Sequence, residues 1–442
     1  MTIQEFAAKL RAGAVTSAEI VDGCLARIEA GNQATNAFIL VMAEEARRQA
    51  READRELAAG RDRGPLHGVP LSIKDLMDVR GTETTAASRV RTGHVAAADA
   101  PCVANLRAAG AVFVGKTNLH EYALGTTSGD SAFGAVRNPL DTTRSPGGSS
   151  GGSAVSVATG MALATVGTDT GGSIRIPAAC CGIVGLKPSI GEVSTDGVIP
   201  LSSTFDHVGP LAASVSDSWT MFRALLGDPK AQPLTAAAPP AIRLAVPRPY
   251  FCDMLDDDVR ARFEEALNTF RSAGMCVSEI AIPHTDTIAS VYIRISLKEA
   301  AAFHAAMLNA VPERYTPPVR QRLETGRGIQ QEDYMLALGG REQLQRDVDA
   351  ALADCDALVL PTLPIPAPKI GAEQVQVGST QQPLRNVMLR LTQLFNITGH
   401  PAISIPCGLT SDGMPCGLQL VGRRAQTGPL VQIALACESV LA

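Results

Sequence analysis

The chain has 442 residues, of which 45% are hydrophobic, and its formal net charge is −5 at pH 7. These values predict a soluble globular protein of enzyme size with a large buried core. They exclude a strongly basic nucleic-acid-binding protein, and no apolar run approaches the roughly 18 residues that a membrane helix needs. The charged N-terminus lacks a signal-peptide apolar region, and the ten cysteines form no CxxC pair. We therefore expect a reduced, cytoplasmic protein without structural zinc.

The predicted elements alternate between helices and short apolar strands. Thr16 and Glu19 form a capping box before a helix with apolar residues at helical spacing, and a charged helix follows over 44–58. Strands are predicted at 70–73, 111–115, 242–246, 356–361, 402–406 and 417–422, and later helices at 257–273 and 340–353. This alternation predicts an α/β fold with helices on both faces of a sheet.

The segment 230–249 is rich in proline and alanine. It fits either a linker between two domains or a surface crossing within one domain. We favour the crossing, because the few strands that follow would pack better as part of one continuous sheet. The expectation is a single domain over 1–442.

Two short motifs match known patterns without the required context. Residues 110–117, GAVFVGKT, fit the P-loop pattern, but the four residues between its glycines read as a strand instead of a phosphate loop. Residues 147–151, GGSSG, fit the nucleophile elbow of α/β-hydrolases, but the segment before them is polar and turn-like. Nucleotide binding and an α/β-hydrolase site are therefore the weaker interpretations.

Lys74 ends the apolar part of the stretch GVPLSIKD, directly after a predicted strand. Burial at such a place disfavours the charged form of a lysine and so favours a basic amine. A pairing with Asp75, or a side chain that reaches solvent, is the structural alternative.

Two glycine–serine tracts either form flexible linkers or line a site. The first, SPGGSSGGSA at 145–154, runs directly into an apolar stretch, so 149–160 is predicted to be a buried helix entered through a glycine turn. The second is TGGS at 170–173, and it also follows an apolar stretch. Its successive N–H groups suit an oxyanion hole.

At this point the sequence resembles the amidase signature family. The resemblance is carried by GVPLSIKD (68–75), GAVFVGKTNLHEYALG (110–125), RNP (137–139), SPGGSSGGSA (145–154), GTDTGGSIRIPAACCGIVGLKPS (167–189), DHVGPLA (206–212), PAISIPCG and GMPCGLQLVG. It covers nearly the whole chain. It implies an α/β amidase-signature fold: one large, mixed, twisted β-sheet covered by helices on both faces. The signature core would span about 66–215 and a divergent substrate-pocket region about 230–400.

The resemblance also implies a Ser–Ser–Lys triad. Ser173 matches the nucleophile, Ser149 the bridging serine after a cis peptide bond, and Lys74 the base. Neutral Lys74 would take a proton from Ser149, which would take one from Ser173 as it attacks an amide carbonyl. The amides around Thr170, Gly171 and Gly172 would hold the oxyanion.

Neighbouring residues have two interpretations each. Ser150 either hydrogen-bonds within the site or starts the helix. Arg175 either binds a substrate carboxylate or forms a structural ion pair with Asp169 or another acid. Thr168 and Asp169 are expected to brace the loop.

The resemblance favours a stand-alone amide hydrolase that releases an acid and ammonia or an amine. The alternative is the glutamine-hydrolysing A subunit of a tRNA-dependent amidotransferase. That branch carries an aspartate for the glutamine ammonium, where this chain has Leu389. A binding protein without activity is a third hypothesis, against which Lys74, Ser149 and Ser173 argue.

Substrate selectivity is expected to come from loops after Lys74, from 122–130 and from 286–332. Arg320 and Arg322 in the last segment either face substrate or lie on a charged helix surface. We expect a small-molecule amide as the binding partner, with no cofactor, metal, nucleic acid or membrane, and we leave a homodimer open.

Overall fold

The computed structural model describes residues 2–228, 230 and 234–442. Eleven strands form one mixed sheet, in the order β1-β3-β2-β4-β6-β5-β12-β13-β9-β7-β8. The strands are β1 Phe38–Val41, β2 Pro70–Lys74, β3 Val112–Thr117, β4 Ala164–Asp169, β5 Val184–Lys187, β6 His207–Ala212, β7 Arg243–Pro247, β8 Cys276–Ile280, β9 Ala357–Pro361, β12 Ala402–Leu409 and β13 Pro415–Val421. A separate hairpin joins β10 Gln374–Val377 to β11 Thr380–Pro383.

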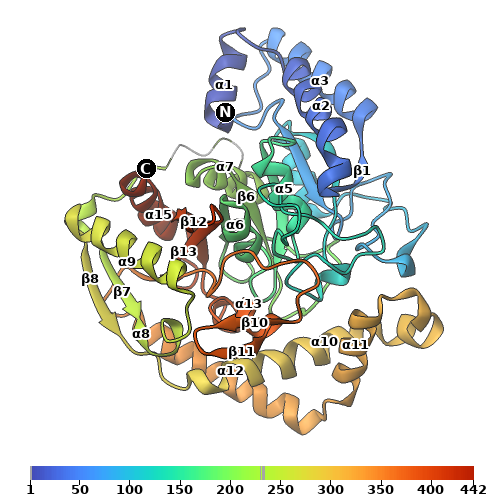
Figure 1. Ribbon diagram of the computed structural model, residues 1–442. Helices are drawn as coiled ribbons and strands as arrows, with labels where there is room; N and C mark the ends of the chain where they lie inside the picture. The colour runs from blue at the N-terminus through green and yellow to red at the C-terminus, as the bar shows by residue number, and fades with distance from the viewer. Residues whose placement is uncertain (1, 229, 231–233) are drawn as a thin grey trace.

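Helices surround this sheet (Figure 1). They are α1 Ile3–Arg11, α2 Ser17–Thr35, α3 Ala43–Ala58, α4 Pro101–Ala108, α5 Gly151–Ala158, α6 Arg175–Cys181, α7 Val215–Leu225, α8 Arg248–Phe251, α9 Asp257–Ser272, α10 Ile288–Ala310, α11 Pro317–Gly328, α12 Gln331–Ala351, α13 Leu384–Leu389, α14 Leu394–Ile397 and α15 Thr427–Leu441. The α/β class and the large mixed sheet with helices on both faces are confirmed.

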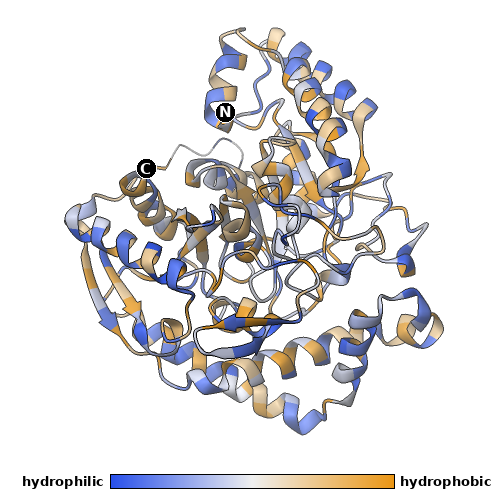
Figure 2. Ribbon diagram, in the orientation of Figure 1, coloured by the Kyte–Doolittle hydropathy of each residue, from blue (hydrophilic) through white to orange (hydrophobic). Residues whose placement is uncertain are grey.

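Alternation along the strands explains how both faces become covered. Val112 and Val114 of β3 point into a core that α2, α3 and α5 share. Phe113 between them points into the larger core, which includes α4, α7 and α9. Successive side chains of a strand point to opposite faces, so an apolar run such as AVFV needs helices on both sides. In Figure 2, blue and orange residues interleave along the outer helices α3 and α9, as expected where only one face is buried.

The local sequence signals are mostly confirmed. Thr16 caps α2 through the predicted capping box with Glu19, and the predicted strands all form within a few residues of their expected bounds. The helix predicted to start at Gly340 is wrong in its start, because α12 begins at Gln331 and runs through Gly339 and Gly340. Packing against α10 and α14 outweighs the weak helix propensity of that glycine pair.

Several elements set the surroundings of the serine tracts. Strands β2 and β4 are parallel neighbours, so their carboxyl ends lie at the same edge of the sheet. Helices α10 and α11 form an arm whose apolar residues pack on the loop 119–124. Of the proline- and alanine-rich segment 230–249, residues 231–233 near its start lie outside the described residues, and the rest leads into β7. No helix in the described part of the chain is both long and apolar enough to cross a membrane.

Candidate active site

Lys74 is the last residue of β2, and its amine lies at the centre of a group of hydroxyls. Its Nζ donates to Ser149 Oγ at 2.8 Å, to Ser150 Oγ at 2.9 Å and to Thr168 Oγ1 at 2.7 Å. Thr168 lies near the end of β4, so the parallel pairing of β2 and β4 delivers the lysine and the threonine to one edge. Sites in α/β sheets commonly form at the carboxyl ends of strands.

The surroundings of Lys74 favour a neutral amine. The side chain is fully buried, and this burial lowers its pKa to about 7, with Asp169 and Asp206 opposing the shift. Its three partners are uncharged hydroxyls: the ammonium form donates to all three, whereas the neutral amine has two N–H donors and accepts from the third hydroxyl. The amine therefore has the partners to fix its position without a contacting carboxylate to hold its proton.

Ser149 lies in a tightly packed turn. The Gly148–Ser149 peptide bond is cis, as the resemblance implied. A Cβ on Gly148 would stand 2.7 Å from the backbone nitrogen of Ser128, so only glycine fits there. The Ser149 carbonyl accepts from the amide of His120 at 3.1 Å and from Ser128 Oγ at 3.1 Å. The first tract is therefore an ordered wall of the site and not a linker.

The second tract, 170–173, forms the loop between β4 and α6. Its carbonyls are held: Thr392 Oγ1 donates to Gly171 O at 2.6 Å, and the amide of Ser150 donates to Ser173 O at 3.3 Å. Gly172 has φ +140°, a conformation that favours glycine. Among hydrogen bonds between described residues, none uses the amides of 170–173 as donors. These N–H groups are thus available to an oxyanion.

Ser150 serves both of its predicted uses. It is the N-cap residue of α5. Its hydroxyl also accepts from Lys74 and donates to Thr168 O at 3.2 Å. Thr168 was expected to brace the loop, but its hydroxyl instead contacts the lysine. The many Thr and Ser residues in this part of the sequence gave no sign that Thr168 would contact Lys74.

Arg175 forms the structural ion pair and does not face an open site. It is fully buried and pairs with Asp169 through Nη2 at 2.9 Å and Nε at 3.0 Å. Its remaining donors reach Thr392 O, Gln419 Oε1 and Asn396 Oδ1. All five N–H donors of the guanidinium have acceptors, so the substrate-carboxylate interpretation of Arg175 is wrong.

Asp169 braces the loop as expected. Its Oδ2 accepts from the amide of Ile174 at 3.1 Å, and its Oδ1 accepts from Asn396 Nδ2 at 2.8 Å. The Arg175 guanidinium, with Lys187 and Asn396, holds the pKa of this carboxyl well below its usual range despite burial. Asp169 is therefore an anion committed to the fold of the loop.

Asp206 is a neighbour that the sequence did not single out. It accepts from Thr170 Oγ1 at 2.5 Å and from the amides of Leu201 and Ser202. Burial raises its pKa to about 6, although these hydrogen bonds oppose the rise. It anchors the first residue of the TGGS tract. Asp206 belongs to the DHVGPLA stretch, but nothing in that stretch indicated its contact with Thr170.

The two arginines of the segment 286–332 have different surroundings. Arg320 lies 44% exposed and faces Glu324 at 3.5 Å, which matches the surface interpretation. Arg322 is half-buried, donates to Leu124 O at 2.7 Å and lies 3.4 Å from His120 Nε2. It thus reaches the loop that also supports Ser149.

The fold explains why the two other motif matches fail. The residues between Gly110 and Lys116 belong largely to β3, and Lys116 forms a buried ion pair with Asp75 at 2.6 Å. No described strand leads into GGSSG, since the chain from 137 to 150 is irregular. The structural alternative for Lys74 is also wrong, because Asp75 pairs with Lys116.

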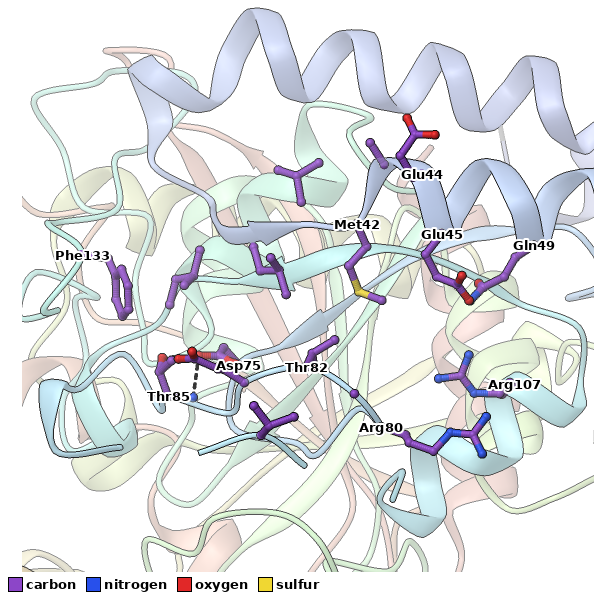
Figure 3. A pocket seen from close by; sticks show the side chains of 17 residues that line it. Met42, Glu44, Glu45, Gln49, Asp75, Arg80, Thr82, Thr85, Arg107 and Phe133 are labelled. Atoms are coloured by element: carbon purple, nitrogen blue, oxygen red, sulfur yellow. Dashed lines mark hydrogen bonds between the residues drawn. The ribbon is translucent and has the colours of Figure 1, made fainter. Parts of the chain in front are cut away.

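A cavity of about 930 Å³ lies beside the edge strand β1, away from the serine tracts (Figure 3). Met42 and Phe133 line it together with Arg80 and Arg107, and Asp75 closes one side. Asp75 already holds Lys116 and Thr85. The two serines of the proposed triad do not line this cavity. Within the described residues, no three His, Cys, Asp or Glu side chains gather to hold a metal ion.

Comparisons with known proteins identify the family of the chain. The Amidase family model matches residues 19–430. The chain is 38% identical to the A subunit of the glutamyl-tRNA(Gln) amidotransferase of Anaeromyxobacter sp. (strain K), over 99% of this chain and 96% of that protein. It is 38% identical to a protein solved as an amidase, with a TM-score of 0.95 and full coverage of both chains.

A second similar structure comes from work on a vestigial protein complex and the evolutionary origins of an s-triazine catabolic enzyme. It is 32% identical, with a TM-score of 0.92, and the match covers 100% of this chain and 98% of that one. The family model spans most of the sequence, and the fold agrees along its full length. The chain belongs to the amidase family.

Proposed function

We propose that this protein hydrolyses a carboxylic amide to an acid and ammonia or an amine, with Ser173 as nucleophile, Ser149 as proton relay and Lys74 as base. The observation that carries the proposal is the hydrogen bond from the buried Lys74 Nζ to Ser149 Oγ at 2.8 Å. A lysine with a pKa of about 7 is neutral in a large share of molecules near neutral pH. A neutral amine accepts a proton, whereas an ammonium does not.

In the proposed reaction, Ser173 Oγ attacks the amide carbonyl while its proton passes to Ser149, whose own proton passes to Lys74. The carbonyl oxygen becomes an oxyanion, which the free amides at Thr170, Gly171, Gly172 and Ser173 would bind. One such donor commonly contributes about 10²- to 10³-fold in rate. The proton returns through Ser149 to the leaving nitrogen as the C–N bond breaks. Water then cleaves the acyl-enzyme ester through the same relay.

The glutamine-hydrolysing component of an amidotransferase is the second candidate. The 38% identity to a protein named as the A subunit of that enzyme supports it. Leu389 favours the stand-alone hydrolase. The amidotransferase branch is expected to carry an aspartate at this position, whereas here the apolar side chain of Leu389 lies against Gly171. Co-purification from the native source separates the two: a stoichiometric partner and glutamine-dependent ammonia release would favour the amidotransferase.

The remaining expectations are proposals as well. We propose one domain over 1–442, supported by a sheet that unites strands from both halves of the chain. A cytoplasmic location and a homodimer stay predictions from the sequence and the resemblance.

The experiment that tests the chemistry is intact-mass analysis after incubation with a fluorophosphonate. We expect one adduct on the wild type and none on Ser173→Ala. Ser203→Ala, at an exposed serine, is the matched control and should be labelled like the wild type. Labelling of a folded Ser173→Ala variant would refute Ser173 as the nucleophile. An unlabelled wild type that also releases no ammonia from any amide would refute the hydrolase.

A further inference from the structure

Arg385 lies on α13, the short helix that packs on the TGGS tract. Leu389, one helical turn further along, is on the same face of this helix. A Cβ on Gly171 would collide with the Tyr292 phenol and lie 3.0 Å from Leu389 Cδ2, so these two side chains flank Gly171. The face of α13 that carries Arg385 is therefore directed at the proposed oxyanion loop.

The Arg385 guanidinium has no acceptor of its own. No hydrogen bond or ion pair joins it to any other residue in the parts of the chain that the structure describes. The side chain is half-buried, so it is not a freely solvated surface arginine. Burial lowers its pKa, and Tyr292 is the one group that opposes this shift. By contrast, all five donors of the neighbouring Arg175 have acceptors.

A second guanidinium, that of Arg322 on α11, lies close enough to Arg385 for their like charges to interact. Arg322 contacts the loop of His120, whose amide binds the Ser149 carbonyl. Burial and the positive charge of Arg385 lower the pKa of Arg322 to about 10. Asp130 is the one carboxylate that opposes this shift, and it already pairs with His120 at 3.1 Å. Asp130 therefore acts on Arg322, and no carboxylate opposes the pKa shift of Arg385.

The same site offers little to a substrate cation. Leu389 is apolar at the position next to Gly171. The nearby carboxylates are engaged: Asp169 with Arg175, Asp206 with Thr170, and Asp130 with His120. Without a free carboxylate, a substrate ammonium would be desolvated with no compensating partner.

We infer that Arg385 binds a carboxylate of the substrate, so that the enzyme prefers a dicarboxylic acid monoamide without an ammonium group over neutral amides and over amides that carry an α-ammonium, such as glutamine. This inference rests on the proposed hydrolase and specifies its substrate class. A guanidinium binds a carboxylate through two parallel, charge-assisted hydrogen bonds. Loss of such a contact in a partly desolvated site typically weakens binding by about 10- to 100-fold.

The test compares matched amides by ammonia release. Glutaramate, valeramide and glutamine share one chain length: valeramide lacks the carboxylate of glutaramate, and glutamine adds an ammonium. Two shorter acidic–neutral pairs, malonamate with propionamide and succinamate with butyramide, extend the series. We expect kcat/KM of the wild type to favour at least one acidic amide over its neutral partner by about 10-fold or more, and glutaramate over glutamine. Arg385→Gln should lower kcat/KM for acidic amides by about 10- to 100-fold more than for their neutral partners, and Arg385→Lys should keep part of the acidic preference.

Arg320→Gln is the matched control, because Arg320 is exposed and faces Glu324, and it should retain the wild-type ratios. A second readout is independent of turnover: glutarate, succinate or malonate should slow fluorophosphonate labelling of the wild type but not of Arg385→Gln. The inference would be overturned if Ser173 were still labelled but the ratio of kcat/KM for acidic to neutral amides were the same in the wild type and Arg385→Gln at all three chain lengths. A wild type without labelling or ammonia release would instead refute the proposed function.

Discussion

Lys74 Nζ lies 2.8 Å from Ser149 Oγ, and the lysine that makes this contact is fully buried. The base and the bridging serine are 75 positions apart in the sequence. One comes from the end of a strand and the other from a glycine turn before a helix. This contact is the geometric basis of the proposed proton relay.

The activity should depend on pH through Lys74. Its pKa is lowered to about 7, and only the neutral amine accepts a proton. We expect kcat/KM to fall about tenfold per pH unit below about pH 7 and to level off above it. Lys74→Met should lose most activity at every pH. A profile that stays flat from pH 5 to 9 would contradict a lysine base.

The stability should also depend on pH through the same residue. Between about pH 7 and 10.5 the unfolded chain holds a proton on Lys74 that the folded chain lacks. The free energy of unfolding therefore gains a contribution that rises with pH, by at most about 1.4 kcal/mol per unit. Urea titrations should show this rise in the wild type relative to Lys74→Met. Lys9→Met, at an exposed site on α1, is the control for loss of a lysine.

Thr168 should contribute to catalysis by fixing the amine. Thr168→Val removes the acceptor at 2.7 Å and keeps the shape of the side chain. We expect kcat to fall about tenfold, the order that one hydrogen bond to a charged group implies, with a lower apparent pKa in the acid limb. Thr165→Val on the same strand removes a hydroxyl that bonds Ser72 instead. Equal effects of both variants would mean that Thr168 acts only through stability.

Arg175 should matter for folding and not for substrate choice. Arg175→Met would leave Asp169 buried without its cation, which costs about 3–5 kcal/mol of unfolding free energy. Chemical denaturation measures this loss, and Arg320→Met at an exposed site should have little effect. If Arg175→Met unfolded normally and lost only acidic amides, the assignment of Arg175 as structural would fail.

Gly171 should tolerate no side chain. A Cβ in Gly171→Ala would stand 2.7 Å from Tyr292 Cζ and 3.0 Å from Leu389 Cδ2, so the loop would have to move. Displacements of about 1 Å can reduce rates about 100-fold, and we expect a loss of that order in kcat and in fluorophosphonate labelling. Gly339→Ala, with open space around it, should behave as the wild type. Undiminished labelling of Gly171→Ala would contradict the placement of the oxyanion amides.

The class of fold, most strands and the triad candidates could be predicted from the sequence. A strand is indicated by residues that are adjacent in the sequence, so short apolar runs such as PLSI and AISIP could be recognised as strands. The resemblance indicated Lys74 through the GVPLSIKD block, and Ser149 and Ser173 through the long glycine–serine blocks. The local signal failed at α12, because Gly339 and Gly340 weaken a helix that tertiary contacts nevertheless maintain.

Which side chains have partners became clear only from the packing of distant segments. The sequence singled out Arg175 as a candidate carboxylate binder, because it follows the TGGS tract, and gave no sign of Arg385. The fold surrounds Arg175 with Asp169, Gln419 and Asn396 and leaves Arg385 without an acceptor among the described residues. Residue types and spacing fix what a group can do chemically, whereas burial and long-range contacts fix whether its charge is already compensated.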